Sequence, residues 1–136
     1  HYPSEFEQNL MKSRIFYLFS KNLQGRQAGL QSAIQAFEER PSGEAMRQVL
    51  FAARYSNLRD DVLEYARNYA EMLQENDEQW RRHDGYYSRA FAGLMVFDFL
   101  ARMERGQGNT EKARQYDSLA KEYQGKVKAF VDLKRW

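Results

Sequence analysis

Residues Ala90 to Met103 read AFAGLMVFDFLARM, a run that is apolar on nearly every side. A helix without a polar face belongs in the interior of a helical assembly, with other helices packed around it. We therefore expect this run to be the central helix of the fold. Gly93 lies within it, and the missing side chain predicts that a neighbouring helix approaches closely there.

The segments on both sides of the central run also space their apolar residues as helices do. After it, Gly106 is the expected C-cap, and a helix begins at Asn109 or Thr110. This helix either ends near Tyr123 or continues past Gly125 to the C-terminus. Before the central run, four helices are expected over roughly residues 5–23, 26–39, 43–55 and 58–73. Ser4 and Glu7 form a capping box at the start of the first helix. Gln24-Gly25 predicts a break after it, and residues 39–43 predict a turn after the second. Gly85 leaves open whether residues 80–87 join the long helix or form a separate turn.

The composition is typical of a packed helical protein. The chain has 136 residues, of which 43% are hydrophobic and 29% are charged, and it contains only two prolines and no cysteine. This length predicts one domain over residues 1–136, and the absence of cysteine excludes disulfides and thiolate metal sites. Short turns make successive helices antiparallel neighbours. The predicted fold class is all-α, a compact bundle of about five to six antiparallel helices arranged as helical hairpins.

The charge balance and hydropathy indicate which partners to expect. The 21 basic and 19 acidic residues leave a net charge of +2, which does not favour nucleic acid as a partner. The basic residues 126–136 fit a docked terminal helix better than a binding site. No apolar run reaches the roughly 18 residues that a membrane-spanning helix needs. A cytoplasmic location is favoured, while an exported or anchored domain stays open because the chain starts at His1.

One part of the chain resembles a known family. Phe97, Leu100 and Ala101, followed by the turn GNTEKA at 108–113 and by Ala120, resemble a tetratricopeptide-type helical hairpin over residues 97–125. Glu104 departs from that pattern, because an aromatic residue is usual at its position. The resemblance implies a scaffold that binds peptide or protein segments and carries no catalytic residues.

The leading hypothesis is a non-enzymatic adaptor domain that recognises a protein or peptide through a groove between helices. Tyrosine and arginine are common anchors of interfaces, because a tyrosine ring buries area while its hydroxyl stays hydrogen-bonded. The candidate contacts are Tyr65, Tyr69, Arg81, Arg82, Tyr86 and Tyr87. The other reading of the tyrosines is core packing with the hydroxyl at the rim. Self-association into a homo-oligomer is a further expectation.

The alternative hypothesis is a small-ligand sensor or an enzyme with a pocket beside the central helix, formed by Asp98 and His83. Asp98 interrupts the apolar run, so its carboxylate needs a partner, and Arg102, one turn later, offers an ion pair. His83 has no second ligand at a suitable spacing, so no metal site is predicted. The sequence points to no cofactor and no catalytic residue, and it favours a non-enzymatic role without deciding the question.

Overall fold

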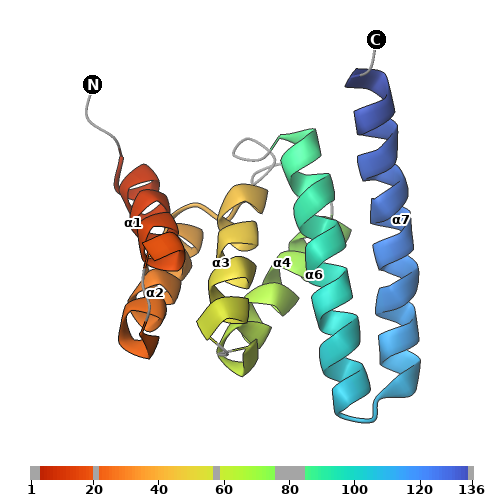
Figure 1. Ribbon diagram of the computed structural model, residues 1–136. Helices are drawn as coiled ribbons and strands as arrows, with labels where there is room; N and C mark the ends of the chain where they lie inside the picture. Colours follow the sequence, from red (N-terminus) through yellow and green to blue (C-terminus); the bar gives the residue numbers. More distant parts are fainter. Residues whose placement is uncertain (1–3, 20–21, 57–58, 76–84, 135–136) are drawn as a thin grey trace.

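The computed structural model describes residues 4–19, 22–56, 59–75 and 85–134. In these ranges the chain is helical and contains no strand, which confirms the predicted all-α fold class. The elements are α1 (Glu5–Phe19), α2 (Leu23–Glu39), α3 (Gly43–Ser56), the short 3₁₀ helix η1 (Arg59–Val62), α4 (Leu63–Glu75), α6 (Tyr86–Gly106) and α7 (Thr110–Lys134) (Figure 1).

The helices stack as hairpins, side by side. Figure 1 shows α1–α2 at one end, α3–α4 in the middle and α6–α7 at the other end, with the two termini at opposite ends of the row. Helix α3 packs against α1 and α2, and α6 packs against α3, α4 and α7. Each hairpin therefore meets the next, and the gaps between neighbouring hairpins are the places where a groove can form.

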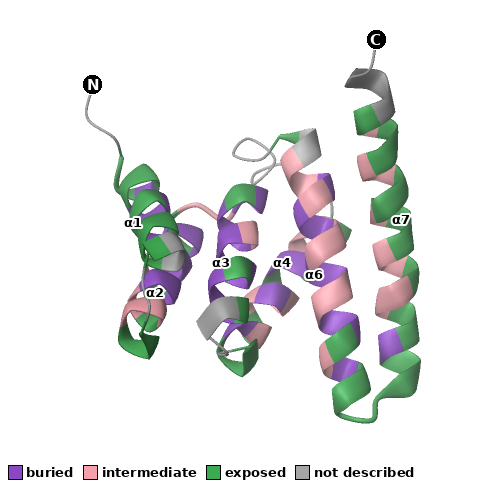
Figure 2. Ribbon diagram, viewed as in Figure 1, coloured by how far each residue is buried: buried purple, intermediate pink, exposed green. Residues whose placement is uncertain are grey.

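The core runs through the row along the inner faces of α2, α3, α4 and α6 (Figure 2). Its largest fully buried residues include Tyr69, Phe97, Leu30, Met46 and Leu100. Alanines fill many of the remaining core positions, which lets the helices approach closely. The core as a whole includes buried residues from α1, α2, α3, η1, α4 and α6, so the helices bury their apolar side chains together.

Helix α6 contacts α3, α4 and α7, but the more central position belongs to α3, which contacts α1, α2, α4 and α6. The burial of α6 is uneven: Val96, Phe97 and Leu100 are buried, whereas Met95 and Phe99 are only half-buried. The half-buried side of α6 lies toward α3, where it lines a groove described below.

Polar side chains cap the starts of three helices. The hydroxyl of Ser4 accepts a hydrogen bond from the amide of Glu7 at 3.2 Å, which confirms the Ser4 half of the predicted capping box. Asn22 Oδ1 accepts from the amide of Gly25 at 2.7 Å, and Ser42 Oγ from that of Ala45 at 3.3 Å. Because Asn22 caps α2, the expected break at Gln24-Gly25 is wrong, and both residues lie in the first turn of that helix.

The turn between α6 and α7 differs in detail from the prediction. Gly106 is the last residue of α6 and Gln107 is the C-cap, so the predicted cap at Gly106 is wrong. Gly108 is the residue that turns the chain, with φ of +81°, a conformation that glycine adopts without steric cost. Helix α7 then runs without a break through Gly125 to Lys134.

Candidate functional site

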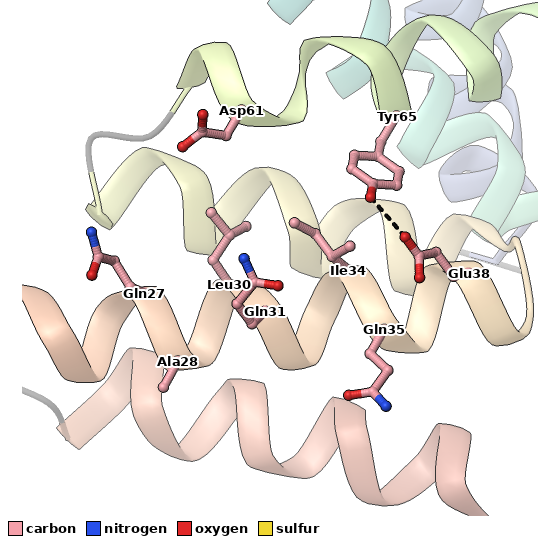
Figure 3. A pocket seen from close by; sticks show the side chains of 9 residues that line it. All are labelled: Gln27, Ala28, Leu30, Gln31, Ile34, Gln35, Glu38, Asp61 and Tyr65. Atoms are coloured by element: carbon pink, nitrogen blue, oxygen red, sulfur yellow. Dashed lines mark hydrogen bonds between the residues drawn. The ribbon is translucent and has the colours of Figure 1, made fainter.

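A groove lies between α2 and the segment formed by η1 and α4, and we call it the α2–α4 groove (Figure 3). Its volume is about 810 Å³. Helix α2 supplies most of the lining, while Asp61 of η1 and Tyr65 of α4 approach from the other side. The lining residues are Gln27, Ala28, Leu30, Gln31, Ile34, Gln35, Glu38, Asp61 and Tyr65.

Three glutamines give this groove its chemical character. Gln27, Gln31 and Gln35 are one helical turn apart on α2, and all three are exposed. Their amides form no hydrogen bond with another residue in the described parts of the chain. Leu30 and Ile34 are buried beside them and give the groove an apolar floor. The groove therefore offers donors, acceptors and apolar surface together.

Tyr65 is held at the rim of this groove. Its hydroxyl donates a hydrogen bond to Glu38 Oε1 at 2.7 Å (Figure 3), and its ring meets that of Phe37 edge to face, with centroids 6.2 Å apart. The hydrogen bond to Glu38 raises the pKa of Tyr65 above its ordinary value, because it favours the protonated phenol; burial and the charge of Glu38 add to the effect. The Tyr65 phenol is thus fixed and neutral at physiological pH.

The other predicted contact residues are not placed at this groove. Tyr69 has no exposed surface and packs against Phe37 with ring centroids 6.1 Å apart, so it belongs to the core and we do not keep it as a partner contact. Arg81 and Arg82 lie outside the described residues, and so do the side chains of Tyr86 and Tyr87. Of the six candidate contacts, Tyr65 alone is placed at a groove by the described residues.

A smaller groove, of about 320 Å³, lies between α3 and α6, and we call it the α3–α6 groove. It is lined by Leu50, Phe51, Arg54, Arg59, Met95, Asp98, Phe99, Arg102 and Met103. The pairing predicted for Asp98 is confirmed, because its Oδ2 lies 3.2 Å from Arg102 Nε. Both side chains are at least half exposed, so this ion pair contributes little to folding.

Asp98, one of the two residues of the small-ligand hypothesis, lines the α3–α6 groove. The second residue of that hypothesis, His83, lies outside the described residues. In the parts of the chain that are described, no group of three or more His, Asp or Glu side chains could hold a metal ion. The small-ligand hypothesis consequently rests on Asp98 alone and stays a prediction.

Glu104 is a buried carboxylate that sequence reasoning did not single out as a structural group. Only 1% of the residue is exposed. Asn109 Nδ2 donates to its Oε2 at 2.7 Å, Arg67 Nη2 donates to its Oε1 at 3.3 Å, and Lys112 Nζ lies 3.9 Å away.

These partners lower the pKa of Glu104, chiefly through the hydrogen bond from Asn109 and against the opposing effect of burial. They come from α4, α7 and the turn before α7, so Glu104 ties three parts of the fold together. It lines neither groove, and we regard it as a structural residue. The sequence showed only that Glu104 stands where the tetratricopeptide pattern usually has an aromatic residue, and its partner Arg67 is distant along the chain.

The outer surface of α1 carries a row of exposed apolar side chains. Met11 and Ile15 are each 53% exposed and Phe19 is 75% exposed, at intervals of one helical turn. Such rows often mark contact surfaces. The expected self-association of the chain stays a prediction, because nothing in the structure shows what covers this row.

Within the described ranges, no helix combines the length and the apolar character needed to cross a membrane. Comparison of the chain with protein-family models, with curated proteins and with solved structures gives no match. The function therefore has to be argued from the two grooves and from the stacking of the hairpins.

Proposed function

We propose that this chain is a non-enzymatic adaptor domain that binds a segment of another protein in the α2–α4 groove. The observation that carries the proposal is the row of exposed glutamines along α2, in which Gln27 and Gln31 lie beside the buried Leu30 and Ile34 and Gln35 points toward α1 (Figure 3). This combination suits a peptide, which presents backbone amides and side chains together.

The glutamine row matches the chemistry of a peptide backbone. Each glutamine amide both donates and accepts hydrogen bonds, as a backbone peptide group does. Successive glutamines of the row are four residues apart, which is about 6 Å along the helix axis, so an extended segment lying along α2 brings several of its backbone groups within their reach. Side chains of the segment that point toward α2 meet the buried floor.

The charged residues that line the groove indicate which charge of the bound segment is favoured. Glu38 and Asp61 both line the groove, and none of its described lining residues is basic. Electrostatic complementarity therefore favours a neutral or basic segment over an acidic one. Tyr65, held by Glu38, is a preorganised aromatic contact that loses little freedom on binding.

The arrangement of the hairpins also supports a scaffold role. Arrays of stacked helical hairpins, in which each repeat contacts its neighbours, present extended surfaces for binding. The hairpins α1–α2 and α6–α7 flank α3 and α4, which contact these neighbours more than they contact each other. The resemblance of residues 97–125 to a tetratricopeptide hairpin points to the same kind of function.

The test is a selection of random peptides displayed on phage against the folded protein, followed by fluorescence anisotropy with the selected peptides. The triple variant Gln27→Ala, Gln31→Ala, Gln35→Ala should weaken binding by roughly tenfold, which corresponds to about 1.4 kcal/mol. It should keep its fold, because alanine is the strongest helix former and all three positions are exposed.

A matched control is the variant Gln115→Ala, Gln124→Ala on the exposed surface of α7, which should bind like the unchanged protein. The proposal fails if no peptide is selected, or if the selected peptides bind the triple variant as tightly as the unchanged protein.

A further inference from the structure

The α3–α6 groove carries an excess of positive charge. Arg54, Arg59 and Arg102 line it together with a single carboxylate, that of Asp98. Arg102 is paired with Asp98. Arg54 and Arg59 form no hydrogen bond or ion pair with other described residues. Two exposed guanidinium groups are therefore available at the edge of this groove.

The floor of the same groove is apolar and incompletely covered. Phe51 of α3 is 36% exposed, and Met95, Phe99 and Met103 of α6 are half-buried. Methionine side chains adapt their shape to an incoming apolar group. The side of α6 that faces this groove is apolar, yet the other helices cover it only in part.

We propose that the α3–α6 groove binds an acidic segment of a partner protein, with one apolar side chain seated on Phe51, Met95 and Phe99 and with flanking carboxylates on Arg54 and Arg59. Guanidinium groups bind carboxylates through paired hydrogen bonds, and the opposite charges steer the segment to the groove. The volume of about 320 Å³ is near the lower end of binding pockets, so it accommodates an anchoring side chain rather than a whole helix.

Two other anionic partners fit this groove less well. A lipid bilayer is a broad surface, whereas the apolar residues here line a narrow groove between two helices. A nucleic acid calls for an extended basic surface, whereas the whole chain has a net charge of only +2. An acidic peptide with an apolar anchor uses both the charge and the floor.

This site is separate from the α2–α4 groove and goes beyond the function proposed above. The two grooves share no lining residue. Arg59 and Asp61, both on η1, contribute opposite charges to the two grooves. The α3–α6 groove consequently selects acidic segments, and the α2–α4 groove selects neutral or basic ones.

The experiment uses fluorescein-labelled peptides in which one central Leu, Phe or Trp is flanked by glutamates. Fluorescence anisotropy measures their binding to the full chain. At least one of these peptides should bind. Replacing its glutamates by glutamine, or its apolar residue by serine, should weaken binding at least about tenfold. Raising the ionic strength should weaken binding as well, because exposed charges are screened.

Matched charge reversals test the position of the site. The variant Arg54→Glu, Arg59→Glu should lose at least about tenfold in affinity, since like charges then face each other. The control Lys121→Glu, Lys128→Glu makes the same change in net charge on the exposed surface of α7 and should bind normally. Circular dichroism should show that both variants keep the helical fold.

Several outcomes would overturn the proposal. Absence of binding by all three acidic peptides does so, as does equal binding by the glutamine-substituted peptide or an equal loss in the α7 control. Phosphatidylserine vesicles and single-stranded DNA are tested as competing partners. If either binds more tightly than the peptides and depends on Arg54 and Arg59 in the same way, the groove belongs to that partner. The triple glutamine variant of α2 should bind the acidic peptide normally, so this proposal and the proposed function can fail separately.

Discussion

Gly93 of α6 lies directly under the ring of Tyr123 of α7, where a Cβ on residue 93 would stand only 2.6 Å from Tyr123 Cε1. The same ring packs against Phe97, one turn after Gly93 on α6, with centroids 5.3 Å apart. Tyr116, two turns before Tyr123 on α7, stacks on Phe97 at 6.2 Å. The predicted close approach at Gly93 is thereby confirmed. Helix α7, whose interface with α6 is the most extensive in the fold, docks through this aromatic contact.

Replacing Gly93 by alanine should destabilise the fold, although alanine ordinarily stabilises a helix interior by about 1 kcal/mol relative to glycine. The added methyl group would overlap the Tyr123 ring, and overpacking of this kind costs about 1–3 kcal/mol. We expect a net loss on the order of 1 kcal/mol in urea unfolding. Gly125→Ala is the matched control: it lies inside α7 with nothing near its Cβ position and should stabilise the fold. A gain for both variants would contradict the contact.

Asn22→Ala should cost about 1 kcal/mol of stability, because the side chain caps α2 through the amide of Gly25. Asn22→Gly should cost only a few tenths of a kcal/mol, since glycine is itself accepted at this position. The midpoints of thermal unfolding for the two variants provide the measurement. Equal losses would show that the side-chain hydrogen bond is not the source of the effect.

The helices could be predicted from sequence because their signals are local. The Ser4 cap and the apolar spacing of α4 depend on residues within a few positions of one another. The start of α2 was misplaced because Gly25 looked like a break, whereas the cap at Asn22 stabilises the first turn enough to contain a glycine. Gly125 is likewise held inside α7, where neighbouring residues pack on α6.

The grooves could not be predicted, because each depends on residues far apart in the chain. The sequence could propose Tyr65 as a contact, but not that Glu38 would hold its hydroxyl. Tyr69 shares the apolar spacing of Tyr65, and only the packing of α2 decides that Tyr69 is buried. The basic α3–α6 groove brings Arg54 and Arg59 beside Asp98, a combination that no local pattern indicates.

Replacing Glu104 by glutamine should destabilise the fold at neutral pH by roughly 1–3 kcal/mol, the range for hydrogen bonds to charged groups. Glutamine keeps the volume of the side chain but removes the charge that Arg67 and Lys112 face. Urea unfolding of the variant and the unchanged protein at pH 7 gives the difference. Glu111→Gln, an exposed residue of α7, should change stability little and serves as the control.

The cost of Glu104→Gln should also depend on pH. The pKa of Glu104 is lower in the folded state than its ordinary value of 4.5. Its charge therefore stabilises the fold above that value, and this contribution is lost as the pH falls through the folded-state pKa. The stability difference between the unchanged protein and the variant should be constant from pH 5.5 to 7 and should shrink below about pH 4.5. A difference that stays constant into the acid range would mean that Glu104 is not held as a carboxylate.

The hydrogen bond between Tyr65 and Glu38 should be measurable by a double-mutant cycle of Tyr65→Phe and Glu38→Gln, with a coupling of about 0.5–1.5 kcal/mol at pH 7. The folded-state pKa of Tyr65 is raised above its ordinary value of 10.0, so this stabilisation is fully present below pH 10 and is lost as the pH rises through the raised value. Ultraviolet absorbance should show that Glu38→Gln shifts the ionisation of one phenol to lower pH. If the tyrosine titration is the same with and without the Glu38 carboxylate, Tyr65 is not held at the rim of the α2–α4 groove, and its place as a preorganised contact is lost.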